Sequence, residues 1–281
     1  MKIASFDAGD GPETGVVIGN RIHSTGIAGS MIDLIAQWDK VKEAVAANAG
    51  RDPGLSLDDI RLLAPVARPG KIFAIGLNYA DHIAESGMGT PAQQVWFTKA
   101  VTSVNAPCDP VVIAAGTACV DYEVELVAII GKRGKHIARA DAADHVFGYC
   151  VGNDVTERAW QHATQQWSLG KSFDTHAPIG PWITTVDDVG DPHALDLRCL
   201  VNGEVRQASN TRHLVFDLWD QIAHLSHAMT LEVGDLIFSG TPGGVGAAMK
   251  PPQFLKAGDV VRCEIERLGA IEAVLQDEVP V

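Results

Sequence analysis

The sequence predicts a β-rich α+β protein, with several packed or rolled sheets and a small α+β block at its N-terminus. Most apolar runs are short, rich in β-branched residues and bounded by Gly, Pro or Asp, as is typical of strands. Helical patterns are few and scattered. Because they do not alternate regularly with the strands, the pattern does not indicate a parallel βαβ sheet.

The first 65 residues differ from the rest of the chain. Short strands joined by Gly and Asp turns are followed by a helix at 31–49, which Gly50 would end. A polar, proline-containing piece at 51–70 then leads onward. We therefore predict a small N-terminal domain over 1–65 and a main domain over 66–281, within the size that 281 residues allow.

Strands dominate the main domain. They are predicted at 71–77, 95–99, 111–116, 124–130, within 131–138 (a turn that leads into a polar strand), 147–154, 181–186, 195–209, 234–240, 259–269 and 270–276. Helices are predicted at 78–87 (ended by Gly87), 141–146, 157–167 and 216–231. The pair Asn202-Gly203 predicts a hairpin turn.

Composition excludes several classes of protein. The chain has 35 Asp+Glu against 22 Lys+Arg and no basic cluster, which argues against nucleic acid binding. No apolar run approaches the roughly 20 residues of a membrane helix, and the N-terminal residues lack the apolar core of a signal peptide. The five cysteines include no CxxC pair, which indicates a reducing compartment. We expect a cytoplasmic protein that binds neither nucleic acid nor a membrane.

Glu123 and Glu125 lie at the start of the apolar strand 124–130. Residues i and i+2 of a strand face the same way, so the two carboxylates would point together beside a buried strand. That repulsion is costly unless a divalent cation offsets it. The alternative is a solvated edge that carries two surface glutamates.

Asp154 ends the strand 147–154 and could supply a third carboxylate. A set of three carboxylates suits Mg²⁺ or Mn²⁺, with Ca²⁺ also possible, better than Zn²⁺, which favours nitrogen and sulfur. The alternative is that Asp154 caps the helix that begins near Glu157.

His82 and Glu85 lie three residues apart on a predicted helix and would share a face. A carboxylate beside an imidazole holds its tautomer and raises its basicity, which makes a general base. The alternative is an exposed helix pair worth a few tenths of a kcal/mol.

Three possible hydrogen-bond donors follow Asp154. Arg158 and Gln161 share a helical face, and Lys171 lies in a turn. Such groups can clamp a substrate carboxylate or stabilise an oxyanion, and the alternative for each is ordinary surface polarity.

The glycine-rich segment 239–246 follows an apolar strand. It lacks both the P-loop ending and the dinucleotide fingerprint, which argues against a Rossmann dehydrogenase. It could present backbone N–H groups, including that of Gly240, and the Thr241 hydroxyl to an anion. Alternatively it is a tight turn.

Six stretches together resemble the fumarylacetoacetate hydrolase family, in the family's order over roughly residues 70–275. They are GLNYADHIAESG, DYEVELVAIIGK, GYCVGNDVTERAWQ, GKSFDTHAPIGPWI, VNGEVRQ and GDLIFSGTPGGVG. The resemblance implies that family's fold of mixed rolled β-sheets, a homodimer, one divalent metal per subunit and a small oxo or diketo acid as substrate.

The resemblance also implies roles for single residues. The metal carboxylates would be Glu123, Glu125 and Asp154, the water-activating dyad on a lid helix would be His82 and Glu85, and polar contacts near metal and substrate would come from Gln161, Lys171, Arg158, Thr241 and Gly240. Many members have Arg-Asp-x-Gln where this chain has Arg-Ala-Trp-Gln, a departure at Ala159 that affects the contacts there.

The activity implied is a metal-dependent catabolic hydrolysis. A C–C bond of a 2,4-diketo acid, either an acylpyruvate or a diketo-deoxy sugar acid, would be cleaved to pyruvate and a second acid. One alternative is decarboxylation or isomerisation of an oxo-dicarboxylic acid by the same enolate chemistry. A second is a module that binds metal and oxo acid without catalysis.

Overall fold

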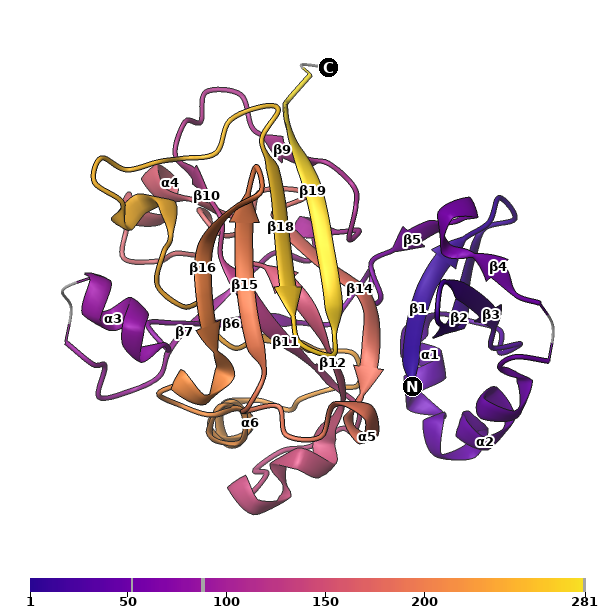
Figure 1. The fold of residues 1–281 in the computed structure, drawn as a ribbon. Helices are drawn as coiled ribbons and strands as arrows, with labels where there is room; N and C mark the ends of the chain where they lie inside the picture. Colours follow the sequence, from indigo (N-terminus) through magenta and orange to yellow (C-terminus); the bar gives the residue numbers. More distant parts are fainter. Residues whose placement is uncertain (52, 87–88, 280–281) are drawn as a thin grey trace.

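The computed structural model describes residues 1–51, 53–86 and 89–279, and strands dominate it as predicted (Figure 1). The largest sheet has twelve strands. Ten of them follow in the order β4 (Leu55–Ser56), β3 (Arg21–Ser24), β2 (Pro12–Ile18), β1 (Lys2–Asp7), β14 (Ala177–Thr185), β12 (Val146–Asn153), β11 (Val124–Ile130), β17 (Leu236–Phe238), β6 (Ile72–Gly76) and β7 (Val95–Thr98). The other two, β5 (Arg61–Leu63) and β8 (Val104–Asn105), pair with β1 and β14.

A second sheet packs against the first. Its five strands follow in the order β16 (Glu204–Asn210), β15 (Asp196–Val201), β18 (Val260–Ile265), β19 (Gly269–Asp277) and β9 (Val111–Ile113). A short pair, β10 (Val120–Asp121) with β13 (Thr156–Glu157), lies beside the start of β11. The fold is therefore β-rich α+β, as the sequence predicts.

Strand β11 is buried on both faces, which explains why all of its residues except Glu125 are apolar. Leu126 and Ala128 face the core shared with the second sheet, where Cys199 and Cys263 also lie. The alternate residues, such as Val127, face a second core on the other side of the sheet. Any polar side chain at either end of this strand therefore enters a protein interior.

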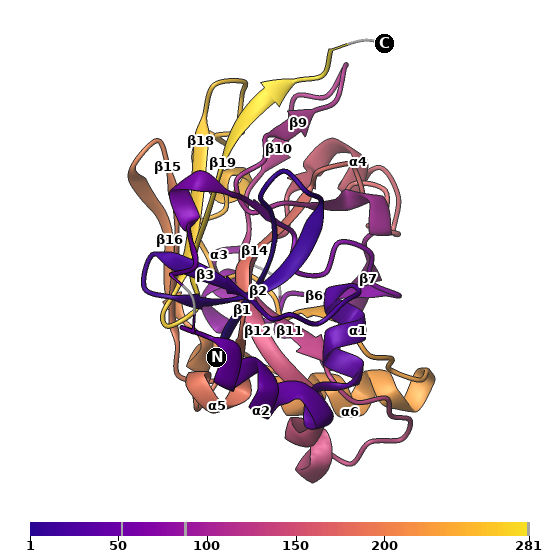
Figure 2. The ribbon, with the colours of Figure 1, turned by 90° about the vertical axis from the view of Figure 1, so that its right-hand side faces the viewer.

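The N-terminal segment forms the indigo and purple group at one side of the molecule in Figure 1, and Figure 2 views the molecule from that side. Its strand β1 pairs with β14 through Lys2 with Thr184 and Ile3 with Ile183, which joins it to the large sheet. The boundary at residue 65 stays a prediction.

Helices are short and lie around the sheets. They are α1 (Met31–Ala36), α2 (Trp38–Asn48), α3 (Ala80–Ser86), α4 (Arg158–His162), α5 (Val186–Val189) and α6 (Leu218–Ala228), and a 3₁₀ helix spans Arg139–His145. The described part of the chain contains no helix with the length and apolar character that a membrane crossing needs. Gly87, predicted to end α3, lies outside the described residues.

Three sequence predictions of local structure are wrong. The single helix at 31–49 is two helices, because Gln37 leaves the helical conformation and its side chain donates to the Asp33 carbonyl. The helix predicted at 157–167 ends at His162, since the Thr164 hydroxyl bonds to nearby backbone instead.

The polar strand predicted at 131–138 is not formed. Gly134 makes an isolated bridge to Leu231, and His136 has φ of 53°, which an extended strand cannot contain.

The packing of β1 generates a stability prediction. Ile3 is completely buried in the core that also contains Ile183, whereas Ile18 at the end of β2 is 49% exposed. Ile3→Ala should therefore lower the free energy of unfolding by about 2–5 kcal/mol, and Ile18→Ala by less than about 0.5 kcal/mol. Denaturant titration measures both, and equal effects would contradict the prediction. A separate early transition would support a domain boundary near residue 65.

Candidate metal centre and active-site cavity

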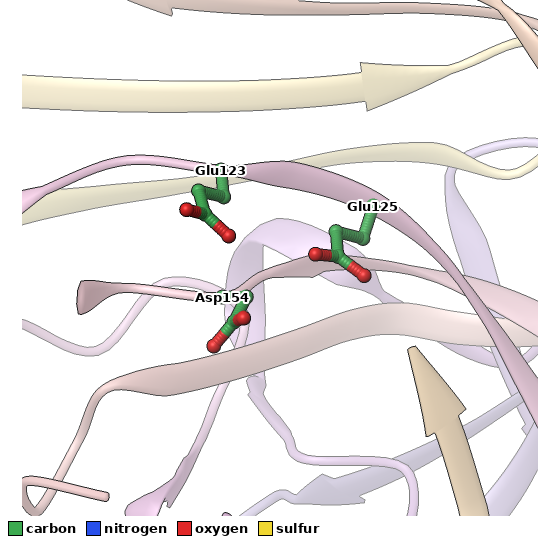
Figure 3. A group of neighbouring side chains, drawn as sticks. All are labelled: Glu123, Glu125 and Asp154. Atoms are coloured by element: carbon green, nitrogen blue, oxygen red, sulfur yellow. The ribbon is translucent and has the colours of Figure 1, made fainter. Parts of the chain in front are cut away.

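Three carboxylates meet where β11 and β12 lie side by side. Glu123 immediately precedes β11, Glu125 lies within it, and Asp154 immediately follows β12. The register pairs Glu125 with Gly152, and the Asp154 N–H donates to the Glu123 carbonyl at 2.9 Å. One oxygen of each carboxylate lies within 4.8 Å of the others, and Figure 3 shows the three side chains as neighbours. The predicted convergence of these side chains is therefore present.

Two cationic side chains hold two of these carboxylates. Lys171 Nζ lies 2.7 Å from Glu123 Oε2 and 2.5 Å from Asp154 Oδ2, and Arg158 Nη1 lies 2.7 Å from Glu123 Oε1. Burial alone would raise the pKa of Glu123, but Lys171 and Arg158 lower it to about 2. Burial would lower the pKa of Lys171, but Asp154 and Glu123 outweigh that and raise it, so Lys171 carries a charge.

Glu125 has no such partner. Its Oε2 accepts the Gly240 N–H at 2.7 Å, while its Oε1 is buried with no hydrogen bond among the described residues. Burial, together with the carboxylates of Asp154 and Glu123, raises the pKa of Glu125 well above its ordinary value. A buried carboxylate oxygen without a partner beside two other carboxylates is unfavourable unless a cation is added.

The donor set therefore fits a hard divalent cation. Glu123, Glu125 and Asp154 offer only oxygen, which suits Mg²⁺, Mn²⁺ or Ca²⁺. The alternative proposed for Asp154 is excluded, because the side chain that caps α4 is that of Glu157, which accepts from Trp160 N.

A cavity of about 290 Å³ opens beside the carboxylates. Its polar lining includes Glu123, Arg158, Gln161 and Lys171, and the Gln161 Oε1 accepts from Arg158 Nη1 at 3.0 Å. Apolar walls include Phe97. The three donors predicted from sequence are thus brought together at one cavity.

Helix α3 places His82 and Glu85 at the same cavity. His82 Nδ1 lies 3.8 Å from Glu85 Oε2, too far for a hydrogen bond. Glu85 Oε2 instead accepts the Gly244 N–H at 2.9 Å, and His82 Nδ1 is buried without a hydrogen-bond partner among the described residues. The two groups are neighbours, but the imidazole is not held by the carboxylate.

The glycine-rich segment bonds mainly to the protein itself. The Thr241 hydroxyl donates to the Val124 carbonyl at 3.0 Å and accepts from Gln207 Nε2 at 2.8 Å, although Thr241 also lines the cavity. The Gly240 N–H is directed at Glu125, and its φ of 101° is a conformation that favours glycine. Substrate binding by Thr241 and Gly240 stays a prediction.

Sequence reasoning missed two charged residues. Lys99 is buried and its Nζ lies 2.6 Å from Asp154 Oδ1. Asp121 is buried, pairs with Arg158 at 2.8 Å and accepts the N–H groups of Gly246 and Ala247. The sequence pattern did indicate Asp121, because it lies two residues before Glu123, just as Glu123 lies two residues before Glu125. Lys99 at the end of an apolar strand was indicated more weakly.

The comparisons with known proteins agree with this site. Residues 71–276 match the family described as Fumarylacetoacetate (FAA) hydrolase C-terminal. A Xenopus laevis protein, "Oxaloacetate tautomerase fahd2, mitochondrial", is 42% identical over 283 residues, which cover 96% of this chain and 89% of the relative.

Solved structures are similar over almost the whole chain. Maleylpyruvate hydrolase from Sphingobium sp. SYK-6 superimposes with a TM-score of 0.86 at 36% identity, and its complex with manganese (II) ion and pyruvate with a TM-score of 0.85 at 35% identity. Each covers 99% of this chain and 100% of the solved chain. These relatives are enzymes with hydrolase or tautomerase names. The chain belongs to the fumarylacetoacetate hydrolase family.

Proposed function

We propose that this protein is a metal-dependent enzyme that interconverts the keto and enol forms of a small 2-oxo dicarboxylic acid such as oxaloacetate. The observation that carries the proposal is the cavity of about 290 Å³, which places Arg158, Lys171 and Gln161 beside a carboxylate cluster that fits a divalent cation. The tautomerase relative, 42% identical over nearly the full chain, supports the same reaction.

Glu123, Glu125 and Asp154 would hold the ion, which would supply Lewis acidity at the 2-oxo oxygen when bound. Mn²⁺ and Mg²⁺ are the metals proposed, and manganese is present in the solved maleylpyruvate hydrolase complex.

The protein's own residues would bind the substrate and move its proton. Arg158 and Lys171 are cations at the cavity wall that suit the substrate carboxylates. His82 lines the cavity, and its imidazole would take the proton from carbon 3 through Nε2, because Nδ1 is buried and faces Glu85. The protonated imidazole would return that proton to the 2-oxo oxygen, so the reaction needs no other reactant. Closer approach of Glu85 would fix the tautomer of His82.

Hydrolytic C–C cleavage of a 2,4-diketo acid is the second candidate. The proximity of His82 Nδ1 and Glu85 Oε2, at 3.8 Å, favours it, because the pair could deprotonate a water. Lys171 and Gln161 would then stabilise the oxyanion. The maleylpyruvate hydrolase likeness supports this reading. The homodimer and the cytoplasmic location stay predictions.

Glu125→Gln should separate the metal role from a structural one. Glutamine replaces a buried carboxyl whose charged form is disfavoured beside Asp154 and Glu123, so the metal-free protein should lose no stability and should gain up to about 1 kcal/mol. Mn²⁺ affinity should fall by at least about tenfold, because one anionic ligand is lost. Thermal unfolding and calorimetric titration measure the two effects, with the exposed Glu43→Gln as control. Unchanged Mn²⁺ binding would contradict the metal site.

Two substrate assays distinguish the two reactions, and His82→Ala tests the role of the imidazole. Tautomerisation is followed by the ultraviolet absorbance of enol oxaloacetate, and hydrolysis by pyruvate release from acylpyruvates, both with Mn²⁺. We expect oxaloacetate turnover in the wild type and a loss of about a hundredfold or more in the variant, since the proton acceptor is removed. The control is His224→Ala, an exposed site on α6. Binding of oxalate without turnover of either substrate would leave only the non-catalytic module.

A further inference from the structure

We propose that Lys171 and the divalent cation compete for the same two carboxylate oxygens, so that metal binding releases the Lys171 ammonium into the cavity. The inference rests on the metal site proposed above. It adds that the Lys171 ammonium becomes free to pair with an anionic substrate only when the metal is bound.

Each carboxylate oxygen of Glu123 and Asp154 contacts a cationic side chain. Glu123 Oε1 is held by Arg158 and Asp154 Oδ1 by Lys99. The remaining oxygens of these two groups, Glu123 Oε2 and Asp154 Oδ2, are both held by Lys171 Nζ, at 2.7 Å and 2.5 Å. A cation held by all three carboxylates would need one oxygen from each, and those contacting Lys171 are the ones not committed to Arg158 or Lys99.

Lys171 differs from the other two cations in that its hydrogen-bond partners among the described residues are the same carboxylates that would hold the ion. Arg158 is also fixed by Asp121 and Gln161, and Lys99 Nζ also donates to the Val155 carbonyl at 3.3 Å. The hydrogen bonds of Lys171 Nζ in the described residues go to the two shared carboxylates alone. Since like charges at contact distance repel strongly in a buried site, the arriving ion would displace Lys171.

The released ammonium of Lys171 would move into the cavity that Lys171 already lines. Lys171 lines the cavity, and its Nζ lies 4.8 Å from the centroid of the Phe97 ring, which can stabilise a cation. Gln161 also lines the cavity, and its Oε1, which accepts one hydrogen bond from Arg158, can accept a second from the ammonium. From there the ammonium could pair with a substrate carboxylate. Metal and substrate would then each strengthen the binding of the other.

The test compares two variants that remove the same charge. Lys171→Met removes the competing cation. Lys99→Met removes a buried cation that contacts Asp154 Oδ1, the oxygen that Lys171 does not contact. Without substrate, calorimetry should show that Lys171→Met binds Mn²⁺ about tenfold or more tightly than either the wild type or Lys99→Met. Equal affinities of the two variants, or no gain in Lys171→Met, would overturn the inference while leaving the metal site intact. Failure of the wild type to bind Mn²⁺ would overturn both.

A second measurement uses the wild-type protein and does not depend on folding of the variants. Lys171 is buried beneath the cavity, with only 2% of its side chain exposed. Acetylation by acetic anhydride, read by peptide mass spectrometry, should rise severalfold at Lys171 when Mn²⁺ is added. Lys99, which is fully buried behind Asp154, serves as the internal control and should not change. Equal labelling of Lys171 with and without Mn²⁺ would contradict its release.

Discussion

The structure depends on how charge is neutralised where two inner strands of its large sheet, β11 and β12, lie side by side. Four buried carboxylates, those of Asp121, Glu123, Glu125 and Asp154, lie within one network that contains three cations, Lys99, Arg158 and Lys171. An isolated charge in a protein interior costs several kcal/mol, so every member of the network must find a partner. The cations pair with three of the carboxylates, and within the described residues Glu125 accepts a hydrogen bond only from the Gly240 N–H. A core selected only for stability would not keep this imbalance, which is typical of a functional site.

The fold makes the network possible because β11 is buried on both faces. The same burial that gives its apolar run excludes water from the carboxylates at its start. The segment after β17 then passes across the end of β11, where Gly240 adopts a conformation that L-residues rarely take and directs its N–H at Glu125. Residues from helix α3 to the glycine-rich segment meet at one cavity, although they are far apart in the chain.

Enolisation and hydrolysis would share the carboxylate cluster and differ in what His82 and Glu85 on helix α3 must do. Moving a proton within the substrate needs one side chain that accepts and returns it. Hydrolysis needs an imidazole basic enough to deprotonate a water molecule. In this structure Glu85 accepts from Gly244 and stands 3.8 Å from His82. Its carboxylate therefore links α3 to the glycine-rich segment rather than orienting the imidazole. Hydrolysis would need Glu85 to move closer to His82, whereas enolisation would not.

Sequence alone determined the β-rich class, most strands and the three convergent carboxylates. These features follow from local pattern, because alternation along a strand fixes which side chains share a face. It did not reveal that Lys99 enters the cluster, that Asp121 anchors Arg158, or that Gln37 divides a helix. Only the tertiary structure decided those points. Buried ion pairs join residues such as Lys99 and Asp154 from separate strands, and nothing in the pattern around either residue records the distance to the other.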